Sequence, residues 1–358
     1  MNSQKSSCPV CHSVLSSQIF NGGEKTLATL GWPSSFKEAT NMEKFPLDYV
    51  KCTRCTHIWN RKFNYDAIPY EVNPNRMFNS GEVWQSYLLR TQDKLAKILP
   101  KNPIVIDIGC GEGHFVRDLA HRLEKKGRFI GFDPNASEET GSGIEFLSSY
   151  FDPLKDITKF EPDLLIMRHV LEHLEEPSIF VEQLAFGAST IHKPIYFFAE
   201  TPCVDIAINS NRIVDFFYEH PSQFTKTSFT KLLKMGGEIL WVSKDYGDEV
   251  ANGVVKLGLP QKAILESQKA GEFLRAASKF KSRVISRLNK LSQGDGKIAV
   301  WGGTGKAATF IQHYGLDCAR FPFIVDSDIQ KAGTYVPGTG QRIRHYSELL
   351  SNPVDIII

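Results

Sequence analysis

Short apolar segments alternate with helix-like stretches over the middle of this chain, and this alternation constrains the fold more than any other feature. The segments are IVIDIG from Ile104, RFIGFD from Arg128, IEFL from Ile144, DLLIM from Asp163 and IYFFAE from Ile195. Strands buried in a parallel sheet have this apolar character, and the crossover between two of them usually contains a helix. The pattern therefore predicts an α/β domain with a doubly wound parallel sheet.

A second set of apolar segments follows a long basic stretch. Residues 261–291 are amphipathic, begin after Pro260 and end near the breaker cluster SQGDG, so they predict one linking helix. The segments KIAVWGGTGK, FPFIVDSD and PVDIII then restart the alternation, which indicates a second α/β unit. Because the sequence stops at Ile358 inside an expected buried strand, we expect the chain to be truncated there.

Composition narrows the class of protein. The 358 residues exceed what one core usually serves, and 23% charged residues are typical of a globular protein. The net charge is +2 and the basic residues are spread along the chain, which gives no support for a nucleic-acid partner. The N-terminus lacks the apolar core of a signal peptide, and no apolar run approaches a membrane span. We expect a cytoplasmic protein without a membrane partner; the oligomeric state stays open.

Four of the seven cysteines stand in two pairs with the spacing of metal ligands. The pairs are Cys8 with Cys11 in CPVCH and Cys52 with Cys55 in KCTRCTH. Two C-x-x-C knuckles supply enough thiolates to close a tetrahedral structural zinc site, and His12 or His57 beside them offers a replacement ligand. The surrounding segment shows little apolar periodicity, so we expect zinc to stabilise it. Disulfides are not expected in a reducing compartment.

A glycine-rich loop follows the strand that carries Asp107. Gly109 and Gly111 stand in D-I-G-C-G-E-G-H-F, where glycine lets a ligand approach the backbone. The helix that begins near His114 offers free amide groups at the same place. Asp133 ends the next strand in G-F-D-P, and its carboxylate can accept both hydroxyls of a ribose. These residues predict a nucleotide-type cofactor at the carboxyl ends of the strands.

Two cofactors compete for this arrangement. A dinucleotide loop reads G-x-G-x-x-G, whereas an acidic residue precedes the first glycine here, and Asp107 would repel a pyrophosphate. The loop resembles the class I methyltransferase motif, which implies S-adenosylmethionine and an ammonium group near Asp107. R-H-V-L-E-H-L-E-E-P resembles the methyltransferase segment after the fourth strand, which implies a cofactor contact by His169. The metalloprotease pattern H-x-x-E-H in this segment is set aside, because no third ligand is evident.

The segment F-F-Y-E-H-P-S-Q-F-T beyond the fifth strand carries a more specific resemblance. With W-G-G-T-G-K-A and V-D-S-D-x-x-K-A-G near the C-terminus, it resembles the sugar C-methyltransferases that act on nucleotide-linked keto-deoxysugars. The resemblance covers essentially the whole chain and implies three parts. These are a zinc-binding module at 1–62, a methyltransferase domain at 63–256 and a C-terminal Rossmann-like domain at 257–358.

The same resemblance implies the catalytic residues. The family's Y-H-E-H segment falls on residues 217–220, with Glu219 and His220 identical. Its tyrosines fall on phenylalanines, at Phe217 and in the sequence M-F-N-S at Phe78, so Tyr70 and Tyr218 are the candidates for a missing hydroxyl.

C-methylation beside a ketone needs a base, a donor for the enolate oxygen and an aligned sulfonium methyl. We expect His220 to be the base, because an imidazole titrates near working pH, with Glu219 as its neighbour and Tyr218 as a further catalytic candidate. Three alternatives stay open: an O- or N-methyltransferase on a related sugar or small metabolite, a binding or scaffold protein without turnover, and a purely structural histidine at position 220.

Overall fold

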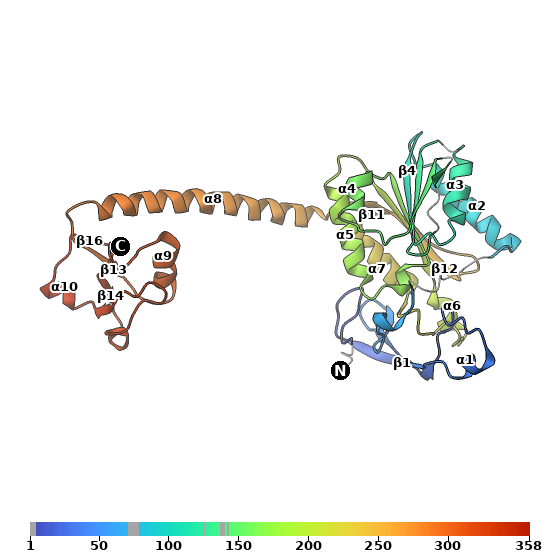
Figure 1. The fold of residues 1–358 in the computed structure, drawn as a ribbon, viewed down its shortest axis with the longest axis horizontal. Coiled ribbons are helices and arrows are strands. Elements are labelled where there is room, and N and C mark those ends of the chain that lie inside the picture. The colour runs from blue at the N-terminus through green and yellow to red at the C-terminus, as the bar shows by residue number, and fades with distance from the viewer. Residues whose placement is uncertain (1–4, 71–78, 125, 137–139, 142) are drawn as a thin grey trace. The chain divides into compact units, whose positions relative to one another are not determined.

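The computed structural model describes residues 5–70, 79–124, 126–136, 140–141 and 143–358. The chain forms two compact units, residues 1–260 and residues 261–358 (Figure 1), and each is described by itself. The finer division at residues 62 and 256 stays a proposal.

An eight-stranded sheet forms the centre of the first unit, in the order β11-β12-β9-β8-β4-β5-β7-β6. The bounds are β4 (Ile104–Ile108), β5 (Arg128–Phe132), β6 (Thr140–Gly141), β7 (Ile144–Leu147), β8 (Leu164–Arg168), β9 (Tyr196–Pro202), β11 (Gly237–Asp245) and β12 (Val250–Leu257). All five segments predicted as strands belong to this sheet. The sheet is mixed rather than wholly parallel, because β12 runs antiparallel to β9 and β11. The short turn between β11 and β12 can join only antiparallel strands.

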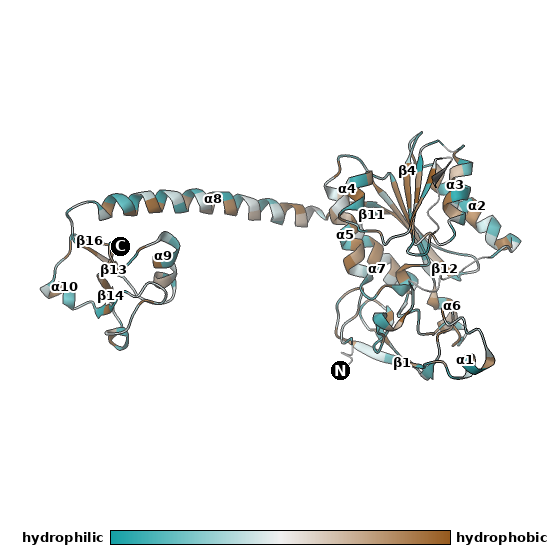
Figure 2. Cartoon of the chain, in the orientation of Figure 1, coloured by the Kyte–Doolittle hydropathy of each residue, from teal (hydrophilic) through white to brown (hydrophobic). Residues whose placement is uncertain are grey.

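Helices cover both faces of this sheet, and the strands contribute alternate side chains to two cores. The helices are α2 (Glu82–Ala96), α3 (His114–Arg122), α4 (Asp156–Phe160), α5 (Pro177–Ser189) and α7 (Lys226–Gly236). Val105 on β4 packs with residues of α2 and α3, whereas Ile106 packs with residues of α5 and α7. The strands around β4 are accordingly coloured mainly as hydrophobic (Figure 2). Burial on both faces explains their continuous apolar character.

The N-terminal residues form a second, antiparallel sheet in the order β1-β2-β3-β10. Its strands are β1 (Ser16–Lys25), β2 (Phe45–Cys52), β3 (Ile58–Asn60) and β10 (Ser222–Gln223), and the short helices nearby are α1 (Phe36–Thr40), η1 (Tyr65–Ala67) and α6 (Val204–Asn209). Its core includes Leu47 and Ile58 from the N-terminal strands together with Phe216 and Tyr218. The N-terminal segment therefore shares both a sheet and a core with residues 204–223.

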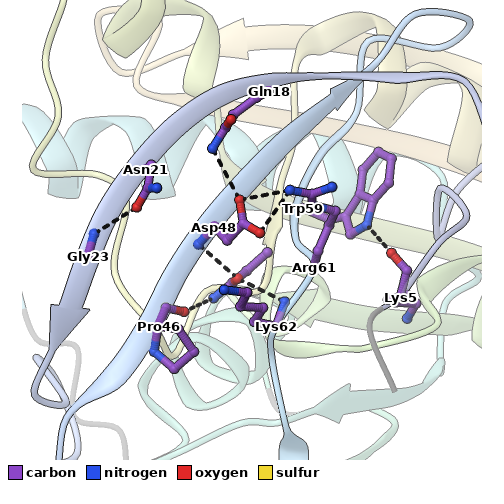
Figure 3. A network of polar contacts seen from close by, with 10 residues as sticks. Lys5, Gln18, Asn21, Gly23, Pro46, Asp48, Trp59, Arg61 and Lys62 are labelled. Atoms are coloured by element: carbon purple, nitrogen blue, oxygen red, sulfur yellow. Dashed lines mark hydrogen bonds and ion pairs between the residues drawn. The ribbon is translucent and has the colours of Figure 1, made fainter. Parts of the chain in front are cut away.

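A network of hydrogen bonds and an ion pair surrounds Asp48 on β2 of this sheet (Figure 3). The buried carboxylate of Asp48 accepts a hydrogen bond from Gln18 on β1 at 3.3 Å and one from the Arg61 guanidinium at 2.9 Å. The indole of Trp59 donates to the carbonyl of Lys5 at 3.4 Å. Because a buried charge is costly without partners, these contacts favour one arrangement of β1 and β2.

The second unit begins with the long helix α8 (Gln261–Ser292), where the sequence predicts a linking helix. The elements that follow are β13 (Ile298–Trp301), α9 (Lys306–Tyr314), β14 (Ile324–Asp326), η3 (Ile329–Lys331), β15 (Ile343–His345), α10 (Glu348–Ser351) and β16 (Ile356–Ile357). The strands form a parallel sheet in the order β15-β14-β13-β16, as the restarted alternation predicts. Among the described residues, no helix combines the length and the apolar character needed to cross a bilayer.

Candidate cofactor and catalytic site

The glycine-rich loop joins β4 to α3 at the carboxyl end of the central strand. Gly109 and Gly111 have φ of 69° and 54°, a left-handed backbone that favours glycine. A Cβ added at Gly109 would lie 2.4 Å from Val170 Cγ2, whereas one at Gly111 would meet no described atom within 4 Å. The loop is therefore packed against Val170 at Gly109 and is open toward a ligand at Gly111.

Asp133 lies one residue beyond β5 and faces this loop. Its Oδ2 accepts a hydrogen bond from the Gly111 amide at 3.0 Å, and its Oδ1 accepts one from the Asn135 amide at 2.9 Å. The carboxylate is thus held in one orientation with lone pairs left for further donors. Asn135 also donates from its side chain to the carbonyl of Tyr70 at 2.7 Å, which brings the Tyr70 segment to the same place.

The glycine loop, Asp133 and Asn135 line one cavity of about 630 Å³. All five residues expected to contact the cofactor line it: Asp107, Gly109, Gly111, Asp133 and His169. Its volume lies within the range of small-molecule sites, roughly 300–1,000 Å³. The space at Gly111 and the fixed carboxylate of Asp133, which keeps lone pairs for ribose hydroxyls, fit a nucleotide-type cofactor such as S-adenosylmethionine.

Asp107 is almost fully buried at this cavity. Burial raises the pKa of its carboxyl to about 7; Arg168 opposes this rise, and the carboxylates of Asp133 and Glu200 add to it. Near neutral pH the Asp107 carboxyl is thus partly protonated, and a cationic ligand beside it would favour the ionised form.

We predict that adenosylhomocysteine binds more tightly as the pH rises from about 6 to about 8, by up to about tenfold per pH unit below the Asp107 pKa. The ligand's ammonium favours the ionised carboxylate, so binding below this pKa releases a proton. Calorimetry in buffers with different ionisation enthalpies measures that proton. An Asp107→Asn variant should bind more weakly and without this dependence. An unchanged dependence in the variant would assign the proton to another group.

A buried ionic network supports the cavity, and sequence reasoning missed it. Arg168 at the end of β8 pairs with Glu200 on β9 at 2.8 Å, and the Tyr87 hydroxyl of α2 donates to the same carboxylate. The guanidinium of Arg168 also lies 4.4 Å from the ring centre of Phe115. A sequence signal existed, because Glu200 ends the apolar segment IYFFAE as Asp133 ends RFIGFD.

The imidazole of His169 lies between two carboxylates. Its Nε2 is 3.0 Å from Glu200, and its Nδ1 is 3.4 Å from Glu172. Burial opposes protonation, but the hydrogen bonds and charges of the two carboxylates outweigh it and raise the pKa of His169 to about 9. A protonated imidazole has no lone pair to accept a proton, so His169 provides a cation at the cavity and is not a base.

A second cluster of polar side chains lies at the edge of the cavity. The Tyr70 hydroxyl is 3.0 Å from Nδ1 of His173 and donates to the carbonyl of Glu219 at 3.2 Å, and His173 Nδ1 donates to that carbonyl at 2.7 Å. The ring centre of His220 lies 4.7 Å from that of His173 and 4.1 Å from that of Phe217. Burial and the neighbouring His173 lower the pKa of His220 to about 3, below the working pH near which the sequence led us to expect it to titrate. The imidazole is therefore neutral, but it is a weaker base than expected.

The residues that line the cavity include none of the three expected catalytic residues, His220, Glu219 and Tyr218. The buried carboxylate of Glu219 accepts hydrogen bonds from the amides of Ala28, Thr29 and Leu30 through Oε1, at 2.7, 2.7 and 3.2 Å. The Tyr218 hydroxyl accepts one from the amide of residue 64 at 2.9 Å. Both side chains thus face the N-terminal segment rather than the His220 imidazole.

The backbone around His220 is held by the N-terminal sheet. The Tyr49 hydroxyl on β2 contacts the carbonyls of Phe217 and His220 at 2.6 and 2.9 Å. The hydroxyls of Thr56 and Thr225 are 2.6 Å apart. Phe78, the position on which the second family tyrosine falls, lies outside the described residues. Of the two hydroxyl candidates, Tyr70 is the one that lines the cavity.

The four paired cysteines form one compact cluster. Their sulfur atoms all lie within 4.8 Å of one another. Each knuckle closes with the same turn: the amide that follows it donates to the carbonyl of its first cysteine, at 2.9 Å for His12 and 3.1 Å for Thr56, and both residues have positive φ. The amides of Arg54 and Cys55 also point at Cys52 Sγ, each at 3.4 Å. The arrangement fits a tetrahedral thiolate-bound ion.

Two family models match the chain. Residues 82–237 match a family described as methyltransferase domain, and residues 236–358 match one described as C-methyltransferase C-terminal domain. No curated protein matches the chain.

Two solved structures that match part of the chain are distant from it in sequence. One is magnesium protoporphyrin IX methyltransferase from Synechocystis with bound SAH: 16% identity, TM-score 0.34, covering 50% of this chain and 88% of that one. A second is a SAM-dependent methyltransferase from Aquifex aeolicus: 16% identity, TM-score 0.35, covering 51% of this chain and 100% of that one.

Proposed function

Because the chain is an S-adenosylmethionine-dependent methyltransferase with the α/β class I fold expected from its sequence, we propose that it methylates a carbon atom. The proposed substrate is a nucleotide-diphosphate keto-deoxysugar, methylated beside its ketone. The observation that carries the proposal is the match of residues 236–358 to a family described as C-methyltransferase C-terminal domain, in a chain whose His220 packs against His173 at the edge of the cofactor cavity. When bound, the cofactor supplies an electrophilic methyl group.

The proposed reaction needs a base, because a carbon beside a carbonyl is not nucleophilic until it loses a proton. His220 takes this role in the proposal. Its neutral imidazole carries a lone pair and lies against His173, which lines the cavity. Tyr70 is proposed as the donor for the enolate oxygen, because its hydroxyl lies in the same cluster. Glu219 acts indirectly: its carboxylate anchors residues 28–30, and its carbonyl orients Tyr70 and His173.

Two tyrosine variants separate the candidate hydroxyls. We predict that Tyr70→Phe lowers kcat by about tenfold to a thousandfold with little change in cofactor affinity, since it removes a donor to the developing oxyanion. Tyr218→Phe is the matched control and should leave kcat nearly unchanged, because that hydroxyl meets the amide of Asn64. Steady-state kinetics on the two variants make the test. A larger loss in Tyr218→Phe than in Tyr70→Phe would reverse the assignment.

We further propose that the cysteine cluster holds one structural zinc ion. Four thiolates leave no position open for water, so the ion would stabilise the fold and take no part in the chemistry. In this proposal residues 1–62 are the zinc-binding module that precedes the methyltransferase domain.

A cytoplasmic location and a small-molecule substrate complete the proposal. Four cysteines cluster as metal ligands rather than as disulfide partners, a use of cysteine typical of a reducing compartment.

Product analysis tests the proposed function. A panel of nucleotide-linked keto-sugars is offered with isotopically labelled cofactor, and mass spectrometry locates the methyl group. We expect label on the carbon next to the ketone. Label on oxygen or nitrogen would replace the C-methylation proposal by the alternative methyltransferase on the same scaffold, and binding of the cofactor with no product from any acceptor would favour a non-catalytic role.

A further inference from the structure

A second group of metal-ligating side chains lies apart from the cysteines, at the edge of the cofactor cavity. Glu172, His173 and His220 each offer one ligand atom, and these atoms all lie within 4.8 Å of one another. Glu172 and His173 are neighbours in the turn η2 (Leu171–His173), whereas His220 comes from the segment before β10. The hydrogen bond from His173 to the Glu219 carbonyl holds the two segments together. The last two residues of the H-x-x-E-H sequence, Glu172 and His173, thus gain a third candidate ligand, His220, only in the folded chain.

The donor set suits a divalent transition metal. Two imidazoles and one carboxylate are the ligands of zinc sites that keep a fourth position open, and imidazole also binds Co²⁺, Ni²⁺ and Cu²⁺. A tetrahedral zinc ion with bonds of about 2.1 Å holds its ligand atoms about 3.4 Å apart. His220 is partly exposed, and among the described residues its imidazole makes only ring contacts, with His173 and Phe217. Its ring nitrogens are therefore not committed to a hydrogen bond among the described residues.

Neighbouring groups orient the other two ligands as they do in metal sites. Because Nδ1 of His173 donates to the Glu219 carbonyl, the lone pair of its neutral ring resides on Nε2. The Glu172 carboxylate is fixed by a hydrogen bond from the Thr201 hydroxyl to Oε2 at 3.0 Å. Its buried Oε1 lies 3.4 Å from Nδ1 of His169.

We propose that Glu172, His173 and His220 bind a divalent transition-metal ion, and that the bound ion inhibits methylation. A metal occupies the lone pair of His220 that would otherwise accept the carbon-bound proton, so metal binding and proton removal exclude each other. The binding site is independent of the proposed function, whereas the inhibition rests on it.

Zinc is the probe for binding. The protein as purified is analysed for metal, equilibrated with Zn²⁺, passed through gel filtration and analysed again. We expect one additional zinc per chain in the wild type and in the control His192→Asn, an exposed histidine elsewhere in the first unit. His220→Asn should weaken this added binding by at least about tenfold to a hundredfold, the loss that follows removal of supporting groups alone. No added zinc in the wild type, or equal added zinc in His220→Asn, overturns the site.

Cobalt gives a readout that needs no variant. Co²⁺ added to the protein as purified should give visible bands typical of nitrogen and oxygen ligands without thiolate charge-transfer absorption. Bands with thiolate character would place the ion at the cysteines and overturn the site. The methylation assay then separates the two claims: added Zn²⁺ should inhibit reversibly, with recovery on chelation. If zinc binds through His220 and methylation continues, the site stands and the assignment of His220 as base fails.

Discussion

Replacing His220 with asparagine is expected to lower the methylation rate by about a hundredfold to ten-thousandfold, the range for loss of a general base. Only carbon methylation requires a proton to be removed first, because a sugar hydroxyl already carries lone pairs. Removal of that proton leaves a trace that can be measured without turnover. With a keto-sugar and adenosylhomocysteine in deuterated water, the wild type should exchange the hydrogen at the future methylation site, and His220→Asn should not.

Cofactor affinity separates this loss from a folding defect. His220 is absent from the cavity lining, whereas Asp107 and Asp133 belong to it, so adenosylhomocysteine should bind His220→Asn almost as tightly as the wild type. His192→Asn serves as the matched control and should retain both exchange and methylation. Methylation of the true substrate at an unchanged rate in His220→Asn would exclude the imidazole as the base.

Replacing Cys52 with serine is expected to remove zinc and to lower the free energy of unfolding by more than about 4 kcal/mol, the size of effect associated with loss of a metal site. We also expect methylation to be lost while cofactor affinity is largely kept. The reason is the contact between the N-terminal sheet and the catalytic segment: residues 28–30 bind the Glu219 carboxylate, and Tyr49 contacts the His220 carbonyl. The cofactor cavity uses residues of the larger sheet instead.

Elemental analysis, thermal unfolding and calorimetry measure these three effects. Cys318→Ser is the control, because this cysteine is exposed in the second unit and lies far along the chain from the cluster. Purified protein without zinc would refute the metal assignment. Zinc-free protein that still methylates at the wild-type rate would instead show that the N-terminal sheet does not hold the catalytic segment in place.

The strands, the glycine loop and the cysteine pairs could be predicted from the sequence alone, because each depends on the residue types at neighbouring positions. A parallel strand buried on both faces must be apolar, and β4, β5, β7, β8 and β9 all lie in segments with that character. Gly109 and Gly111 have positive φ, a conformation that favours glycine, so the presence of glycine at these positions predicts the turn. The spacing of Asp107 and Asp133 after neighbouring strands likewise predicts that both reach one edge of the sheet, and both line the cavity.

Only the tertiary structure decided which groups surround the candidate catalytic residues, because those contacts join segments far apart in the chain. Adjacency in sequence predicts a Glu219–His220 pair, yet successive side chains point in different directions, and the Glu219 carboxylate meets residues 28–30. Tyr70 and His173 meet at the backbone carbonyl of Glu219, a contact that no residue type reveals, and His220 packs against the His173 ring. The N-terminal segment looks too polar to form a core by itself because four of the ten buried residues of that core come from residues 204–218.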